Sequence, residues 1–145
     1  MILGIGIDLV AVARIEKLRA RRGQRGLQRL LTARELEHCL RLSASGPSLA
    51  ARVAAKEAYY KAIGTGIGAH GGWRDVEVAR RDNGRPLLIL HGAAARYARE
   101  RGVRRVHLAL THTLDMAAAT VTLEGIDPQD GHHGWEADGA REGNV

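Results

Sequence analysis

The chain has 145 residues, 45% of them hydrophobic, which is enough for one domain of ordinary size but not for two. A lone cysteine, Cys39, cannot form an internal disulfide, and no apolar stretch reaches the ~18 residues of a membrane-spanning helix. The apolar start contains Asp8 and lacks a basic leader, so no signal peptide is expected and a cytoplasmic protein is predicted.

The net charge of +6 is unevenly distributed along the chain. Residues 125–145 carry a net charge of −4, which leaves +10 on residues 1–124. A body this basic attracts an anionic partner, such as a nucleic acid, a phosphorylated small molecule or an acidic protein. We therefore predict one basic domain over residues 1–124 and a flexible acidic tail over residues 125–145, which are polar and glycine-rich.

The first third of the chain predicts one strand and two helices. Residues 4–10 alternate apolar with small or polar side chains, which predicts a short strand that ends near Asp8. Residues 12–20 place apolar side chains three positions apart, which predicts a helix with one apolar face and a basic face opposite to it. Thr32 and Glu35 fit a capping box, so a second helix is predicted to start there.

An alanine-rich helix is predicted over residues 49–63, because this segment contains no helix breaker and Gly64 follows it. The loop predicted over residues 43–48 ends at Ser48, which can cap the helix. A glycine-rich loop, "GTGIGAHGGW", follows the helix.

The second half of the chain alternates between strand and helix signals. The "DNG" at 82–84 is a strong turn signal between two apolar segments, so the flanking strands are predicted to form a hairpin. The predicted elements are strands over 75–81 and 86–90, a helix over 92–101, and strands over 106–113 and 116–124. Helices mixed with hairpins predict a single α+β domain with a mainly antiparallel sheet packed against helices.

The alanine-rich helix carries charged residues next to the glycine-rich loop. Glu57 and Lys61 lie four residues apart and share one helix face. Gly64, Gly66 and Gly68 follow, and glycine lets backbone amides approach an anion closely, so this region suggests a phosphate site. The loop lacks the pattern of a nucleotide-binding P-loop. The alternative is an exposed helix face that carries one Glu57–Lys61 ion pair.

Asp8 is an acid inside an apolar strand, a position that is costly unless charged partners or a metal compensate for it. Two interpretations stay open: Asp8 caps a helix that begins near Leu9 or Val10, or Asp8 and Glu57 together hold a metal ion. Mg²⁺ takes one or two carboxylates together with phosphate oxygens and water. His112 lies at the end of a predicted strand. Three roles stay open for it: orienting a phosphate, transferring a proton, or forming a hydrogen bond at a turn.

Four segments occur in one order: "GIGIDLVAVARI" at 4–15, "RVAAKEAYYKAIGTGIG" at 52–68, "NGRP" at 83–86 and "LALTHTLDMAAATVTLE" at 108–124. In these motifs the chain closely resembles the bacterial holo-acyl-carrier-protein synthases, which belong to the 4'-phosphopantetheinyl transferase superfamily. The resemblance covers residues 1–124, and it implies the α+β fold of that superfamily.

The resemblance implies transfer of the 4'-phosphopantetheine group from coenzyme A to a serine of apo acyl carrier protein, with adenosine 3',5'-bisphosphate as the other product. It implies that Asp8 and Glu57 bind Mg²⁺ and that Lys61 contacts the phosphate region. Asp8, Glu57, Lys61 and His112 are then the catalytic residues, and Glu57, a water or His112 accepts the serine proton. The positions that would line coenzyme A are Arg52, Lys61, Gly64, Asn83, Gly84, Pro86, Thr111 and His112.

The resemblance also implies that the acidic carrier meets the first helix, at Arg14, with Arg21 and Arg25 extending the same basic surface. It further implies a homotrimer with sites between subunits, and it predicts neither a nucleic-acid nor a membrane partner. Two other functions are compatible with parts of the sequence: a nucleic-acid-binding module, which the low aromatic content of 3% disfavours, and a Mg²⁺-dependent pyrophosphatase acting on coenzyme A.

Overall fold

The computed structural model describes residues 1–126, which form four α-helices, one short 3₁₀ helix (Trp73–Asp75) and five strands. All strand pairs among these residues are antiparallel, so the predicted α+β class is confirmed. The last strand includes Gly125, which the sequence placed in the tail. The rest of the predicted tail, from residue 127 onward, lies outside the described residues.

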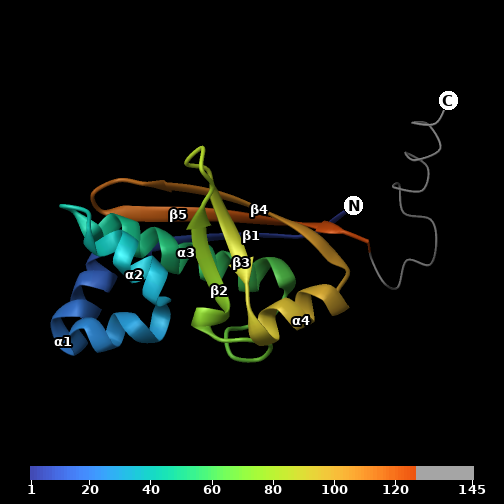
Figure 1. Ribbon diagram of the computed structural model, residues 1–145, viewed down its shortest axis with the longest axis horizontal. Coiled ribbons are helices and arrows are strands. Elements are labelled where there is room, and N and C mark those ends of the chain that lie inside the picture. Colours follow the sequence, from blue (N-terminus) through green and yellow to red (C-terminus); the bar gives the residue numbers. More distant parts are fainter. Residues whose placement is uncertain (127–145) are drawn as a thin grey trace.

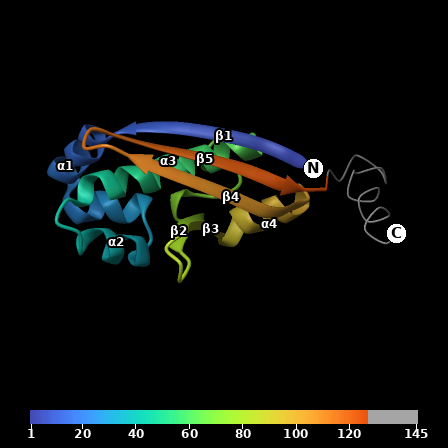
Figure 2. The ribbon, with the colours of Figure 1, turned by 90° about the horizontal axis from the view of Figure 1, so that it is seen from above.

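The main sheet has the strand order β1-β5-β4, with β1 (Ile2–Ala11), β5 (Met116–Gly125) and β4 (Val103–His112). A separate hairpin consists of β2 (Val76–Arg80) and β3 (Pro86–Leu90). Figure 2 shows β1 along one edge of the main sheet and the hairpin beyond the opposite edge, next to β4. The two edges of the sheet therefore face different surroundings.

The helix α3 (Ser45–Ile63) lies against the inner face of the main sheet and is buried along most of its length (Figure 1). Gly4 and Gly6 of β1 face this helix, and a Cβ atom at either position would collide with the backbone oxygen of Ala62 or Ala58. Glycine therefore lets β1 and α3 come closer than any other residue would. The remaining helices are α1 (Val12–Leu30), α2 (Ala33–Leu40) and α4 (Gly92–Glu100).

Two helices are longer than predicted. The helix α3 begins at Ser45 instead of residue 49, because Pro47 is tolerated in the first turn, where its missing N–H needs no partner. Ser48 therefore lies inside the helix and does not cap it. The helix α1 continues to Leu30 instead of ending near residue 20, and it is kinked at Gly23, whose φ is 56°.

The capping box that begins α2 is confirmed. The Glu35 backbone N–H donates to the Thr32 hydroxyl at 3.3 Å, and the Thr32 N–H donates to the Glu35 carboxylate at 2.8 Å. The strand β4 starts at Val103, three residues earlier than predicted, and β2 begins one residue later because Asp75 belongs to the 3₁₀ helix.

The outer face of the main sheet, opposite α3, carries an apolar stripe on β1. Ile5, Ile7 and Leu9 point away from α3, and 65%, 63% and 63% of their surface is exposed. Burying side chains of this size is favourable by about 1.5–3 kcal/mol each, so an uncovered row of three is costly. Among the described residues, none of the helices has the length and hydropathy that crossing a membrane requires.

Candidate active site

Two acids that are distant in sequence meet where β1 contacts α3. Asp8 lies on the inner face of β1 and is only 8% exposed, and Glu57 projects from α3. Burial, followed by the neighbouring Asp8 carboxyl, raises the pKa of the Glu57 carboxyl, and the hydrogen bond from Arg14 opposes this rise only in part. The Oδ2 atom of Asp8 is buried and has no hydrogen-bond partner among the described residues.

The position of Asp8 settles one of the open alternatives. β1 continues to Ala11, and α1 begins at Val12 without a side-chain cap, so Asp8 does not cap a helix. Its inward position follows from the strand period of two, because Gly6, Asp8 and Val10 share the face that packs against α3. The Asp8 carboxyl therefore lies in the otherwise apolar layer between β1 and α3.

Each of the two acids has one cationic neighbour. The Lys61 ammonium donates to Asp8 Oδ1 at 2.6 Å and to the Ile7 carbonyl at 3.2 Å, and the bond to Asp8 raises the Lys61 pKa. The Arg14 guanidinium donates to Glu57 Oε1 at 3.1 Å. The alternative interpretation, a Glu57–Lys61 ion pair along an exposed helix face, is wrong, because Lys61 pairs with Asp8 of β1 instead.

The residues present fit a small divalent cation. Two carboxylates lie together, and the unpartnered Asp8 Oδ2 has free lone pairs in a buried place. No cluster of three or more His, Cys, Asp or Glu side chains suited to a metal occurs within residues 1–126. Such a cation would therefore need further ligands from phosphate oxygens and water, which is the usual environment of protein-bound Mg²⁺.

The predicted site residues of the hairpin lie apart from this cluster, whereas the Gly64 N–H donates to the Lys61 carbonyl at 3.2 Å. Asn83 and Gly84 form the turn of the β2–β3 hairpin, where Asn83 Oδ1 accepts from the backbone of Arg85 and Gly84 has a φ of 82°. Pro86 starts β3 next to them. Gly64 ends α3 in the left-handed conformation, with a φ of 79° and open space around it.

Thr111 and His112 end β4, the edge strand opposite to β1. His112 is exposed and pairs with Ala117, which pairs with Val10, so the three residues share the inner face that also carries Asp8. One chain therefore brings together Asp8, Glu57, Lys61 and Arg14, and it keeps the hairpin and the β4 residues at the other edge of the sheet.

Arg52 is buried inside α3 and only 3% exposed. Its Nη1 donates to the carbonyl of Ser48 at 3.2 Å and to the hydroxyl at 2.7 Å, whereas its Nε has no partner among the described residues. Burial, followed by the charge of Arg52, lowers the pKa of the nearby His38. A buried guanidinium that forms no ion pair with a carboxylate of the described residues creates a positive potential that favours an anion.

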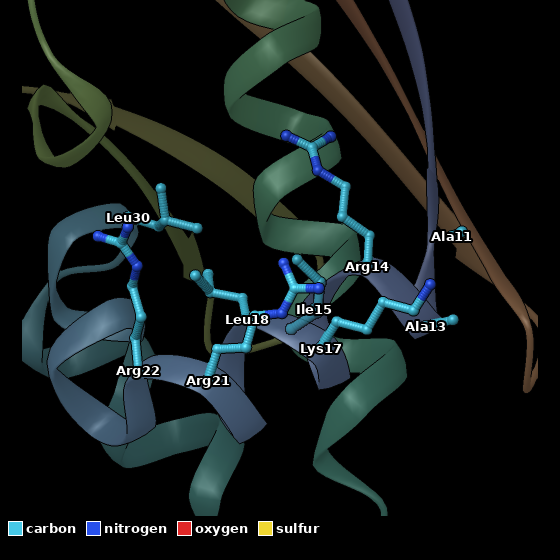
Figure 3. Close-up of a pocket in the computed structure, with 9 residues that line it drawn as sticks. All are labelled: Ala11, Ala13, Arg14, Ile15, Lys17, Leu18, Arg21, Arg22 and Leu30. Carbon is cyan, nitrogen blue, oxygen red and sulfur yellow. The ribbon is translucent and has the colours of Figure 1, made fainter.

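A groove of about 610 Å³ follows the first half of α1 (Figure 3). Its apolar part is formed by Ala11, Ala13, Ile15, Leu18 and Leu30, and its basic part by Arg14, Lys17, Arg21 and Arg22. Arg14 and Arg21, two of the three residues predicted to meet a carrier, therefore line one surface, and Arg25 lies outside the groove. Figure 3 shows the Arg14 guanidinium directed toward α3, which carries Glu57.

Two contacts of the site region were not predicted from the sequence. The first is the Arg14–Glu57 pair, which depends on how α1 lies against α3. The second is made by Lys56, which is completely buried. The Lys56 ammonium donates to Glu35 Oε2 at 2.8 Å and to two backbone carbonyls.

Comparison with known proteins identifies the family. Residues 4–119 match the 4'-phosphopantetheinyl transferase superfamily. A holo-[acyl-carrier-protein] synthase of Koribacter versatilis is 47% identical over 124 residues, which cover 86% of this chain and 99% of that protein. One of Alkalilimnicola ehrlichii is 45% identical over 128 residues, covering 88% of this chain and 100% of that protein.

Solved structures agree with these relatives. The holo-[acyl-carrier-protein] synthase of Neisseria meningitidis has a TM-score of 0.80 at 35% identity and covers 86% of this chain and 99% of its own. The enzyme of Helicobacter pylori, solved in complex with coenzyme A, has a TM-score of 0.73 at 31% identity and covers 83% and 99%. The resemblance seen in the sequence motifs is confirmed, and this chain belongs to the holo-[acyl-carrier-protein] synthases of the 4'-phosphopantetheinyl transferase superfamily.

Proposed function

We propose that this chain transfers 4'-phosphopantetheine from coenzyme A to a serine of apo acyl carrier protein, with Mg²⁺ held by Asp8 and Glu57. The observation that carries the proposal is the meeting of these two carboxylates, one with a buried unpartnered oxygen, beside Lys61. The named relatives and the neighbours solved with coenzyme A support the same substrates.

The reaction needs positioning and charge neutralisation. The serine oxygen forms a bond to the β-phosphorus of the coenzyme A pyrophosphate, and the bond from that phosphorus to the bridging oxygen breaks. Adenosine 3',5'-bisphosphate leaves with the bridging oxygen. Bound Mg²⁺ would neutralise charge on the pyrophosphate, and Lys61, 58% exposed at the edge of β1, can contact the same oxygens after leaving Asp8.

The serine proton needs an acceptor near the two acids. Glu57 is suited to this role because its raised pKa makes its carboxylate a stronger base than an ordinary glutamate. His112, on the inner face of β4, is the alternative acceptor, and it reaches the acids only if another copy of the chain brings it there. We assign the proton to Glu57, directly or through a water.

The complete site requires more than one chain. Asp8 and Glu57 lie at the β1 edge, whereas five of the residues expected to line coenzyme A lie on the β4 edge strand or in the hairpin, which are Thr111, His112, Asn83, Gly84 and Pro86 (Figure 2). The uncovered stripe of Ile5, Ile7 and Leu9 offers the apolar surface for association. We assign these features to a homotrimer in which the β1 edge of one copy faces the β4 edge of the next.

Arg52 and the groove along α1 account for the two anionic substrates. Arg52, buried without a carboxylate partner, is suited to a phosphate group of coenzyme A. The groove combines an apolar floor with Arg14, Lys17, Arg21 and Arg22, which is a surface suited to an acidic carrier helix. The predicted cytoplasmic location and the absence of a nucleic-acid partner stay predictions.

The test is incubation with coenzyme A, MgCl₂ and an apo carrier, followed by mass spectrometry of the carrier. We expect a mass gain equal to one phosphopantetheine group, lost in Asp8→Ala and Glu57→Ala and kept in Glu37→Ala, which alters an exposed acid on α2. Unchanged turnover in both site variants would contradict the metal assignment. Release of free phosphopantetheine without a carrier would indicate a pyrophosphatase instead, and tight binding of random DNA without coenzyme A binding would indicate a nucleic-acid module.

A further inference from the structure

Arg14 belongs to two sites at once. Its guanidinium donates to Glu57 Oε1 at 3.1 Å, next to Asp8. Its side chain also lines the α1 groove with Lys17 and Arg21, and 56% of its surface is exposed (Figure 3). Arg14 therefore contacts both an acid of the cation site and the surface that faces an approaching carrier.

The charges around the two acids cancel while Arg14 is in this position. Asp8 and Glu57 contribute two negative charges, and Lys61 and Arg14 contribute two positive charges within hydrogen-bonding distance. A divalent cation gains little from a cluster without net charge, and Arg14 occupies one of the Glu57 oxygens that would bind it. Loss of the Arg14 contact leaves the cluster negative and frees that oxygen.

Arg14 can exchange partners with a group that enters the groove, and Lys61 cannot, because only Arg14 lines the groove. The Arg14–Glu57 pair is largely open to solvent on the Arg14 side, and such pairs are weak. An acidic side chain in the groove can therefore replace Glu57 as the partner of Arg14. Lys61 does not line the groove and stays with Asp8 when the groove fills.

We propose that Arg14 is a positioning residue that couples docking of an acidic carrier to cation binding at Asp8 and Glu57. With the groove empty, Arg14 pairs with Glu57 and weakens cation binding. With a carrier docked, Arg14 pairs with a carrier carboxylate, and Glu57 becomes available to the cation. This inference rests on the proposed function, because it takes the carrier as the occupant of the groove.

By thermodynamic linkage, the coupling acts equally in both directions. If the carrier strengthens cation binding by a given factor, the cation strengthens carrier binding by the same factor. Because the pair is half-exposed, the factor is expected to be modest, about three- to tenfold. With such coupling, the cation binds most tightly when the carrier that supplies the serine is docked.

The experiment measures Mn²⁺ binding by electron paramagnetic resonance, without coenzyme A, so that no turnover occurs. The matched pair of variants is Arg14→Gln and Lys17→Gln, which remove one positive charge each from the same groove. We expect Arg14→Gln to bind Mn²⁺ about three- to tenfold more tightly than the wild type. Lys17→Gln, whose side chain has no ion pair among the described residues, is expected to change the affinity by less than about twofold.

The same titration is repeated with a saturating carrier whose acceptor serine is replaced by alanine. The carrier should tighten Mn²⁺ binding to the wild type and to Arg14→Lys, which keeps a cation able to exchange partners, and leave Arg14→Gln unchanged. A wild-type affinity that does not move although the carrier binds would overturn the coupling and leave the proposed function intact. A wild type that binds no Mn²⁺ with or without the carrier would also overturn the coupling, and the mass assay tests the proposed function separately.

Discussion

Glu57 lies against another carboxyl group, so the fold stabilises its protonated form. Its pKa is raised, by burial first and by Asp8 second. A raised carboxyl pKa means that the folded state binds this proton more tightly than the unfolded chain does. The stabilisation is present below the ordinary glutamate pKa and is lost as the pH rises through the raised value.

Replacing Glu57 should therefore stabilise the metal-free fold at neutral pH. We expect Glu57→Gln to raise Tm at pH 8 in EDTA by about 3–5 °C, the change that about 1 kcal/mol produces in a domain of this size. The gain should shrink toward pH 4, where the wild-type carboxyl is protonated. Calorimetry at both pH values checks this, with Glu37→Gln as the exposed control. An equal gain at both pH values would contradict the charge argument.

The sequence predicted which two acids belong to the site, Asp8 and Glu57, but not the residues that surround them. Asp8 was recognisable as an acid within an apolar strand, and Glu57 through its motif. Their contact depends on the packing of β1 on α3, which no local pattern encodes. The Arg14–Glu57 pair was missed for the same reason, since helix position alone does not tell which of several arginines on α1 faces α3.

The spacing between β1 and α3 depends on glycines in the strand. A Cβ at position 6 would collide with the backbone of Ala58 and Ala62, which cannot rotate away as a side chain can. We expect Gly6→Ala to lower the free energy of unfolding by about 1–3 kcal/mol and to weaken Mn²⁺ binding, because it separates Asp8 from Glu57. The control is Gly66→Ala, where the space is open. Equal stabilities of the two variants in urea unfolding would contradict this role for Gly6.

The buried Lys56–Glu35 pair joins α3 to α2 and the hairpin. Lys56 is completely buried, and Glu35 also accepts from the Val78 backbone. We expect Lys56→Met to cost about 3–5 kcal/mol, because it leaves a buried carboxylate without its cation. Lys61→Met removes a cation that is 58% exposed, so it should destabilise the fold less than Lys56→Met does, while abolishing transfer. Urea unfolding and the mass assay together check both variants; similar costs would show that Lys56 is not the structural lysine.

Element boundaries were predicted well where a local signal exists. The capping box marked the start of α2, and the "DNG" turn marked the hairpin, because both depend on residues close in sequence. The helix α3 was harder, since it is buried on nearly all sides and its sequence shows no polar face that would reveal its orientation. The burial of Lys56 and Arg52 could therefore not be predicted from the sequence.

The two edges of the main sheet carry different halves of the proposed site. Asp8→Ala damages the β1 edge, and His112→Ala damages the β4 edge. If neighbouring copies share sites, chains of the two variants that are unfolded and refolded together should regain up to about a quarter of wild-type activity, because random assembly reunites two intact halves in that fraction of sites. The mass assay measures this. Activity equal to the average of the separate variants would place each site within one chain.

The row of exposed isoleucine and leucine side chains on β1 has a consequence for thermal measurements. Copies that cover this row bind the folded chain and not the unfolded one, so association contributes to stability by mass action. Tm should then fall when the protein is diluted, and replacing Ile7 with threonine should lower Tm most in concentrated solution. The proposed homotrimer would thus make the melting temperature of this chain depend on protein concentration.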